Sequence, residues 1–166
     1  VILVLLVVFL AACGNEAKSA EVKIKTAVIE TGKGTIKAEL FADKAPFTTK
    51  NFIELANSGF YDGLSFHGVD PGVIIQGGDP KGDGTGGSGK NVPLEINPEL
   101  RHVEGALGMA RFEDPNTASS QFYITLTPQP NLDGKYAVFG KVVSGIEVAR
   151  KITEGDKILK VYIVDE

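Results

Sequence analysis

Cysteine is almost absent from the chain: Cys13 is the single cysteine among 166 residues, so no disulfide can form within the chain. Histidine is nearly as scarce, since only His67 and His102 occur, far apart and with no thiol beside them. Zinc sites in proteins are built from clustered His and Cys side chains. We therefore expect no metal site and no cofactor.

An excess of basic residues is also missing. The chain has 17 Lys and Arg against 21 Asp and Glu, which gives a net charge of −4 and a pI near 5.3. Nucleic-acid-binding domains usually carry a basic face or stripe, and we expect no nucleic-acid partner here. At 43% hydrophobic residues the chain can bury one good core, so a single globular domain and a monomer are expected.

The glycine-rich stretch "GGDPKGDGTGGSGKN" (residues 77–91) partly matches two nucleotide-binding motifs. Both motifs need a helix to follow, because its N-terminus receives the phosphate. Here Val92-Pro93 and an extended stretch follow instead, which excludes nucleotide binding. Asp79 and Asp83 also lack the regularly spaced carboxylates of a calcium loop.

A nucleophile with a matching base is equally hard to find. Ser65 and Ser120 are the serines that a Ser-His-Asp site could use, yet neither lies in a G-x-S-x-G turn. His67 lies two residues from Ser65 on a predicted strand, so the two side chains point the same way without facing each other. A hydrogen-bonded core histidine is the simpler reading of His67. The sequence therefore predicts a site that works without covalent or metal chemistry.

The first twelve residues, "VILVLLVVFLAA", form an apolar run that ends in small residues before Cys13. Its length suits the apolar core of a secretion signal better than a membrane span of roughly 20 residues. Leu10-Ala11-Ala12-Cys13 resembles the lipobox of bacterial lipoproteins, in which cleavage precedes acylation of the cysteine. We expect residues 1–12 to be a signal segment whose true start precedes Val1. Residues 13–21 would be the lipidated cysteine and a polar tether, anchoring the protein to a membrane outside the cytoplasm.

From residue 22 onward, apolar and polar residues alternate in short runs, a pattern typical of β-strands. Strands are predicted at 22–30, 35–41, 64–69, 73–76, 105–110, 120–126, 136–143 and 157–164. A helix is predicted to begin at Ala45-Pro46 and to stop at Gly59, and a second, short one is predicted at 145–152. Because turns rather than helices separate most strands, residues 22–166 are expected to form a mainly β domain.

Five motifs, in this order, resemble the cyclophilin family of peptidyl-prolyl isomerases: "FHGVDPGVIIQGGDP", "GTGGSG", "GALGMAR", "DPNTASSQFYITL" and "NLDGKYAVFGKV". The resemblance runs from about Thr26 to Val164. It implies a closed eight-stranded antiparallel barrel capped by two helices. It also implies isomerisation of X-Pro peptide bonds, with proline-containing exported polypeptides as partners of this chain.

The resemblance also implies a site at particular positions. A proline slot would be lined by Val73, Ile74, Tyr123 and Leu132, with Tyr136 where the family has His or Tyr. Gln76 would be the catalytic polar side chain, Gln121 a second polar partner, Gly84 a neighbour of the residue before proline, and the Ala110-Arg111 main chain a peptide-binding edge. Val73, Ile74 and Leu132 could instead be ordinary core residues, which is the less favoured alternative.

The chain departs from the family at the positions that matter most. Gly68 stands where the family has its main catalytic Arg, and Asn131 stands where it has Trp or His. Val73, Ile74 and Tyr123 replace the usual Phe, Met and Phe. We therefore expect an isomerase of weakened activity. The alternatives are a non-catalytic module that binds proline peptides as a chaperone or assembly factor, and a structural surface lipoprotein.

Overall fold

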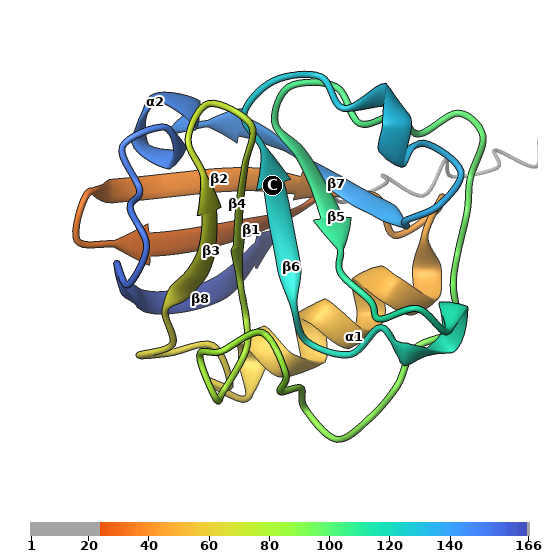
Figure 1. Ribbon diagram of the computed structural model, residues 1–166, viewed down its shortest axis with the longest axis horizontal. Helices are drawn as coiled ribbons and strands as arrows, with labels where there is room; N and C mark the ends of the chain where they lie inside the picture. Colours follow the sequence, from red (N-terminus) through yellow and green to blue (C-terminus); the bar gives the residue numbers. More distant parts are fainter. Residues whose placement is uncertain (1–23, 166) are drawn as a thin grey trace, which may run out of the picture.

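Residues 24–165, the part of the chain that the computed structural model describes, contain eight strands and two α-helices (Figure 1). The strands are β1 (Lys25–Thr31), β2 (Gly34–Leu40), β3 (Phe66–Asp70), β4 (Ile74–Gly77), β5 (Ala106–Met109), β6 (Phe122–Thr125), β7 (Val138–Ser144) and β8 (Ile158–Asp165). The helices are α1 (Pro46–Asn57) and α2 (Ile146–Ala149), and two short 3₁₀ turns lie at Pro115–Thr117 and Pro130–Leu132. The predicted mainly β domain is confirmed, whereas the signal segment, Cys13 and the tether lie outside the described residues.

Local sequence signals explain where these elements begin and end. The hairpin between β1 and β2 turns at Thr31–Gly34, where the Thr31 hydroxyl donates to the Gly34 carbonyl over 2.8 Å. Helix α1 begins at Pro46, as predicted, because proline is favoured in the first helical turn. Its free N–H groups at Phe47 and Thr48 donate to the carboxylate of Glu95, a cap supplied from far along the chain.

The strands form one antiparallel sheet in the order β3-β4-β6-β5-β7-β2-β1-β8. The predicted closed barrel is wrong: the sheet is an open half-barrel whose edge strands are β3 and β8. A short contact joins the two edges: four backbone hydrogen bonds link residues 63–66 to residues 155–158 around an isolated bridge between Ser65 and Lys157. A longer ladder would need extended backbone at 57–63 and 151–154, but those residues end α1 and follow α2.

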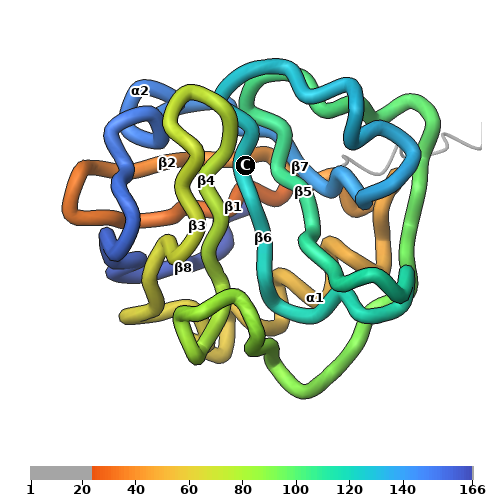
Figure 2. The backbone as a smooth tube through the Cα atoms, in the orientation of Figure 1, coloured from red at the N-terminus to blue at the C-terminus, as the bar shows by residue number. Residues whose placement is uncertain are grey.

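The core lies on the concave side of this sheet, and aromatic rings fill its centre. Phe52 of α1 lies 5.1–5.4 Å, between ring centroids, from Tyr61, Phe122 and Phe139. All four of these residues are fully buried. The two helices lie near opposite ends of the curved sheet, and residues 78–105 form a long connection along one side (Figures 1 and 2). This connection supplies the loop that faces the candidate site.

Candidate functional site

Three predicted site residues, Ile74, Gln76 and Tyr123, lie on the outer face of the sheet, opposite the core. Strand register places Gln76 beside Gly68 on β3 and beside Tyr123 on β6, and Tyr123 beside Gly108 on β5. Alternate residues of the same strands, such as Ile75 and Ile124, point into the core and are fully buried. Because successive strand side chains point to opposite faces, Gln76 and Tyr123 lie together on the face of the sheet opposite the core.

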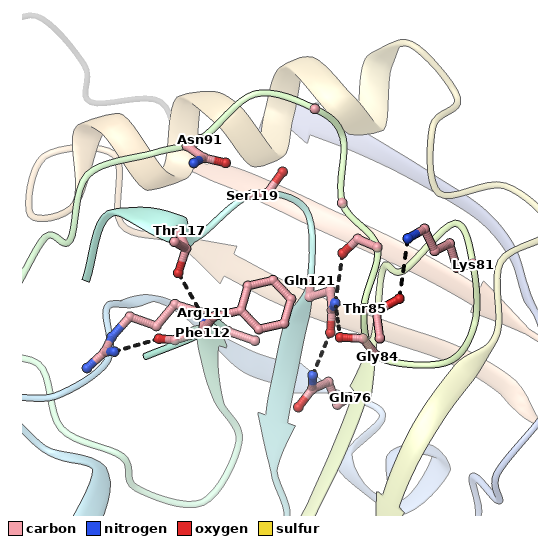
Figure 3. Close-up of a pocket in the computed structure, with 14 residues that line it drawn as sticks. Gln76, Lys81, Gly84, Thr85, Asn91, Arg111, Phe112, Thr117, Ser119 and Gln121 are labelled. Atoms are coloured by element: carbon pink, nitrogen blue, oxygen red, sulfur yellow. Dashed lines mark hydrogen bonds between the residues drawn. The ribbon is translucent and has the colours of Figure 1, made fainter. Parts of the chain in front are cut away.

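Gln121 is the hub of the polar part of this surface (Figure 3). Its amide nitrogen donates to the carbonyls of Gly84 and Gly86 at 2.9 and 2.8 Å. Its amide oxygen accepts from the Gln76 amide at 2.7 Å and from His67 Nε2 at 3.1 Å. An amide oxygen only accepts, so His67 carries its proton on Nε2. Gln121 thus uses its whole amide to hold Gln76 against the glycine-rich loop.

The loop itself is organised by Asp79, whose side chain is buried. Its carboxylate accepts from the backbone N–H groups of Lys81 at 2.8 Å, Asp83 at 3.2 Å and Gly84 at 2.6 Å. Burial by itself raises the pKa of Asp79, but these donors and the N–H of Gly86 together lower it below its ordinary value. A Cβ at Gly86 would collide with the carboxylate, so the loop needs glycine there.

A pocket of about 560 Å³ lies between this loop and the segment after β5 (Figure 3). Five predicted site residues line it: Gln76, Gly84, Ala110, Arg111 and Gln121. The other lining residues, which sequence reasoning missed, are Lys81, Thr85, Gly86, Gly87, Gly89, Asn91, Phe112, Thr117 and Ser119. The sequence signal for Phe112 is its place directly after the predicted Ala110-Arg111 edge.

The predicted proline slot lies apart from this pocket, because none of its five residues lines it. Three of them, Val73, Ile74 and Leu132, are half-buried and are not members of the hydrophobic core. The ring of Tyr123 meets the ring of Tyr136 edge-on with centroids 6.2 Å apart. Gln76 joins the two parts, since it lines the pocket and pairs with Tyr123.

Arg111 is held away from the position that Gly68 leaves open. Its guanidinium donates to the Lys135 carbonyl at 3.0 and 3.1 Å and to the carbonyls of Phe112 and Glu113 at 2.8 and 2.9 Å. It also lies over the Tyr136 ring, 4.9 Å from the centroid. Figure 3 shows the guanidinium directed away from Gln76. Arg111 therefore does not take the place of the missing arginine.

The backbone at Gly68 can carry a side chain. Its φ lies outside the left-handed region, and a Cβ built there would lie 3.4 Å from Cβ of Gln76, an ordinary contact. Strand register places that side chain next to Gln76 on the outer face. The sheet thus keeps room for the group that the sequence lacks.

The comparisons with known proteins agree with this architecture. Residues 26–164 match the family model described as cyclophilin type peptidyl-prolyl cis-trans isomerase/CLD. A peptidyl-prolyl cis-trans isomerase of Synechococcus elongatus is 47% identical over 142 residues, which cover 84% of this chain and 97% of that protein. Peptidyl-prolyl cis-trans isomerase B of Bacillus subtilis is 48% identical over 130 residues, covering 77% and 90%.

Among solved structures, a cyclophilin type peptidyl-prolyl cis-trans isomerase of Cryptosporidium parvum superposes with a TM-score of 0.76 at 37% identity. The superposition covers 86% of this chain and 98% of the Cryptosporidium parvum chain. The chain belongs to the cyclophilin-type peptidyl-prolyl cis-trans isomerase family. Its activity is therefore the interconversion of cis and trans X-Pro peptide bonds.

Proposed function

We propose that this isomerase acts on X-Pro bonds of exported polypeptides and works more slowly than family members that carry the catalytic arginine. The observation that carries the second part is Gly68, which leaves the outer face beside Gln76 without a guanidinium, while Arg111 is bound elsewhere. Gln76 and the glycine-rich loop lie beside this position.

The chemistry explains why such a site needs no nucleophile. Rotation about an X-Pro bond must break partial double-bond character against a barrier of about 18–20 kcal/mol. The slot lined by Val73, Ile74, Tyr123 and Leu132 would hold the proline ring while the preceding carbonyl turns. Gln76 has an amide oxygen and a second N–H that bind nothing else among residues 24–165, so it can favour the twisted state over either planar form.

The pocket beside Gln76 would take up the chain that precedes the proline. Its walls combine loop backbone around Gly84 with the half-exposed ring of Phe112, which turns toward Gln121 (Figure 3). A bound peptide in an extended conformation could pair with the Ala110-Arg111 main chain. The Ala110 carbonyl and the Arg111 N–H lie beyond the end of β5. A peptide would thus be gripped on both sides of the bond that turns.

Membrane anchorage is the part of the proposal that the sequence alone supports. The apolar run before Cys13 is typical of a lipoprotein signal, and acyl chains on the cysteine would hold the protein at a membrane. Within residues 24–165, no helix has the length and apolar character to cross a membrane. Replacement Cys13→Ser should abolish incorporation of labelled fatty acid and release the protein from the membrane fraction. Unchanged labelling would refute the anchor.

The role in export is tested by refolding. An exported protein whose refolding is limited by a proline isomerisation shows a slow phase of tens to hundreds of seconds. Added enzyme should shorten that phase in proportion to its concentration, and a Gln76→Ala variant should shorten it less. A slow phase that stays constant at every concentration would count against catalysis on such clients.

The rival function is a module that binds proline segments without turning them over, and the absent arginine favours it. The two functions differ in one pair of measurements on one peptide. Chemical-shift changes on addition of an X-Pro peptide report binding, and cis–trans exchange reports turnover. Binding with exchange fixed at the uncatalysed rate would select the module.

A further inference from the structure

The side chains of Asp133, His102 and Tyr123 do not line the pocket. They form a chain of hydrogen bonds that ends at the predicted proline slot. Asp133 accepts from His102 Nδ1 at 2.8 Å, and the same carboxylate oxygen accepts from the His102 backbone N–H at 2.8 Å. On the other side of the ring, His102 Nε2 lies 2.8 Å from the Tyr123 hydroxyl. His102 and Tyr123 are buried, at 2% and 3% exposure.

The direction of these hydrogen bonds is fixed from the Asp133 end. The His102 backbone N–H is the largest influence on the pKa of Asp133 and lowers it, with smaller lowering by the His102 side chain and Arg101. An ionised carboxylate only accepts, so Nδ1 of His102 carries the proton. With Nδ1 turned to Asp133, Nε2 is left to pair with the Tyr123 hydroxyl, which can donate a hydrogen bond to it. Burial raises the pKa of Tyr123 and keeps this donor protonated.

The place that the ring of Tyr123 occupies is made available by Gly108. Any Cβ at residue 108 would collide with the ring and the hydroxyl carbon of Tyr123, which lies directly across the strand pair. The ring also lies nearly parallel to that of His102, at 17° with centroids 5.9 Å apart. The hydrogen bond to His102 and the absence of a side chain at Gly108 therefore hold the Tyr123 ring over β5.

Tyr123 is almost completely buried but lies outside the main cluster of core residues. Its ring lies on the outer face, with the ring of Tyr136 edge-on to it. The hydrogen bond to His102 and the glycine at residue 108 therefore fix the position of a residue that the resemblance assigns to the slot.

We propose that His102 and Asp133 are positioning residues of the isomerase: they hold the Tyr123 ring over Gly108 and so keep the slot open for proline. The inference rests on the proposed role of Tyr123 in lining the slot. The hydroxyl of Tyr123 and the absence of a side chain at residue 108 are parts of the same arrangement. His102 and Asp133 do not act on the reacting bond. They set how well proline fits into the slot.

The test is a double-mutant cycle with Tyr123→Phe and Gly108→Ala, read as kcat and KM for an X-Pro peptide. Each single change should raise KM about tenfold with little change in kcat, because a slot that fits proline less well binds ground and transition states equally less. This holds for Tyr123→Phe although Phe is usual in the family, because in this chain the hydroxyl bond to His102 holds the ring over Gly108. Since Gly108→Ala already moves the hydroxyl away from His102, adding Tyr123→Phe should cost little more. His102→Gln, which keeps an acceptor, should stay closer to the parent than His102→Leu.

Tyr61→Phe is the matched control, because the Tyr61 hydroxyl donates to the Ser120 carbonyl from within the core. This control should lower the melting temperature without raising KM. If Tyr123→Phe and Gly108→Ala also lower only the melting temperature, the residues are merely structural and the inference is wrong. A parent that neither binds nor turns over the peptide would instead refute the proposed function, and the inference with it.

Discussion

Replacing Gly68 by arginine is expected to raise kcat/KM for an X-Pro peptide by about 10²–10³-fold, the usual effect of one transition-state donor, or roughly 3–4 kcal/mol. The backbone at Gly68 accepts a side chain without strain, and the new guanidinium would start beside Gln76 on the outer face. As the resemblance to the family implies, it would donate to the carbonyl before the proline and to the prolyl nitrogen as that nitrogen regains its lone pair. Exchange spectroscopy on a short peptide measures the gain.

Gly68→Met is the matched control, because methionine has similar length and flexibility but no donor. It should leave kcat/KM within a few-fold of the parent and should change the melting temperature about as much as the arginine does. An arginine variant no faster than the methionine variant would mean that the slot no longer presents the peptide to this position. The loss of the arginine would then be a consequence of a lost reaction and not its cause.

Asp79→Asn is expected to lower the free energy of unfolding by about 2–3 kcal/mol at neutral pH, because hydrogen bonds to a charged group are strong and a buried donor without a partner is costly. Three backbone N–H groups lie 2.6–3.2 Å from the carboxylate. An asparagine would turn an N–H₂ group toward at least one of them. Urea unfolding of both proteins at several pH values measures the loss.

The pH dependence follows from the lowered pKa of Asp79 in the folded protein. A carboxyl group whose folded pKa lies below its unfolded value of about 3.9 stabilises the fold above that pH. This contribution disappears as the pH falls through the folded pKa. The difference between parent and Asp79→Asn should therefore be constant above about pH 5 and shrink in stronger acid.

Asp43→Asn serves as the control for a general charge effect, since Asp43 is exposed in the turn before α1. It should change the free energy of unfolding by less than about 0.5 kcal/mol, as surface substitutions usually do. A difference between parent and Asp79→Asn that stays the same down to pH 2 would show that the carboxylate charge does not hold the loop.

The local parts of the fold could be predicted from sequence, and its closure could not. Alternation gave the strands within a few residues, and Pro46 marked the start of α1, because both signals depend on neighbouring residues. Whether β3 and β8 pair depends on residues 57–63 and 151–154 being extended. Those stretches are shaped by the ends of the two helices, which no strand pattern reveals.

The candidate site shows the same division. The resemblance supplied the positions of Gln76, Tyr123 and Gly68, and strand register brings all three to one face. The resemblance did not predict that the Gln121 amide nitrogen donates to the carbonyls of Gly84 and Gly86, because these hydrogen bonds depend on the path of the loop. The hydrogen bonds of His102 were missed for a similar reason: its partners come from separate turns and strands, and a lone histidine has no spacing pattern.

The most direct test of a slow but genuine isomerase is the cis–trans exchange rate of a short Ala-Pro peptide against the concentration of the parent protein. The uncatalysed rate is the intercept, and catalysis is the slope. We predict a slope clearly above zero and well below that of Gly68→Arg at every temperature measured. A slope of zero in the parent, with the peptide bound, would show that the chain binds proline segments and does not isomerise them.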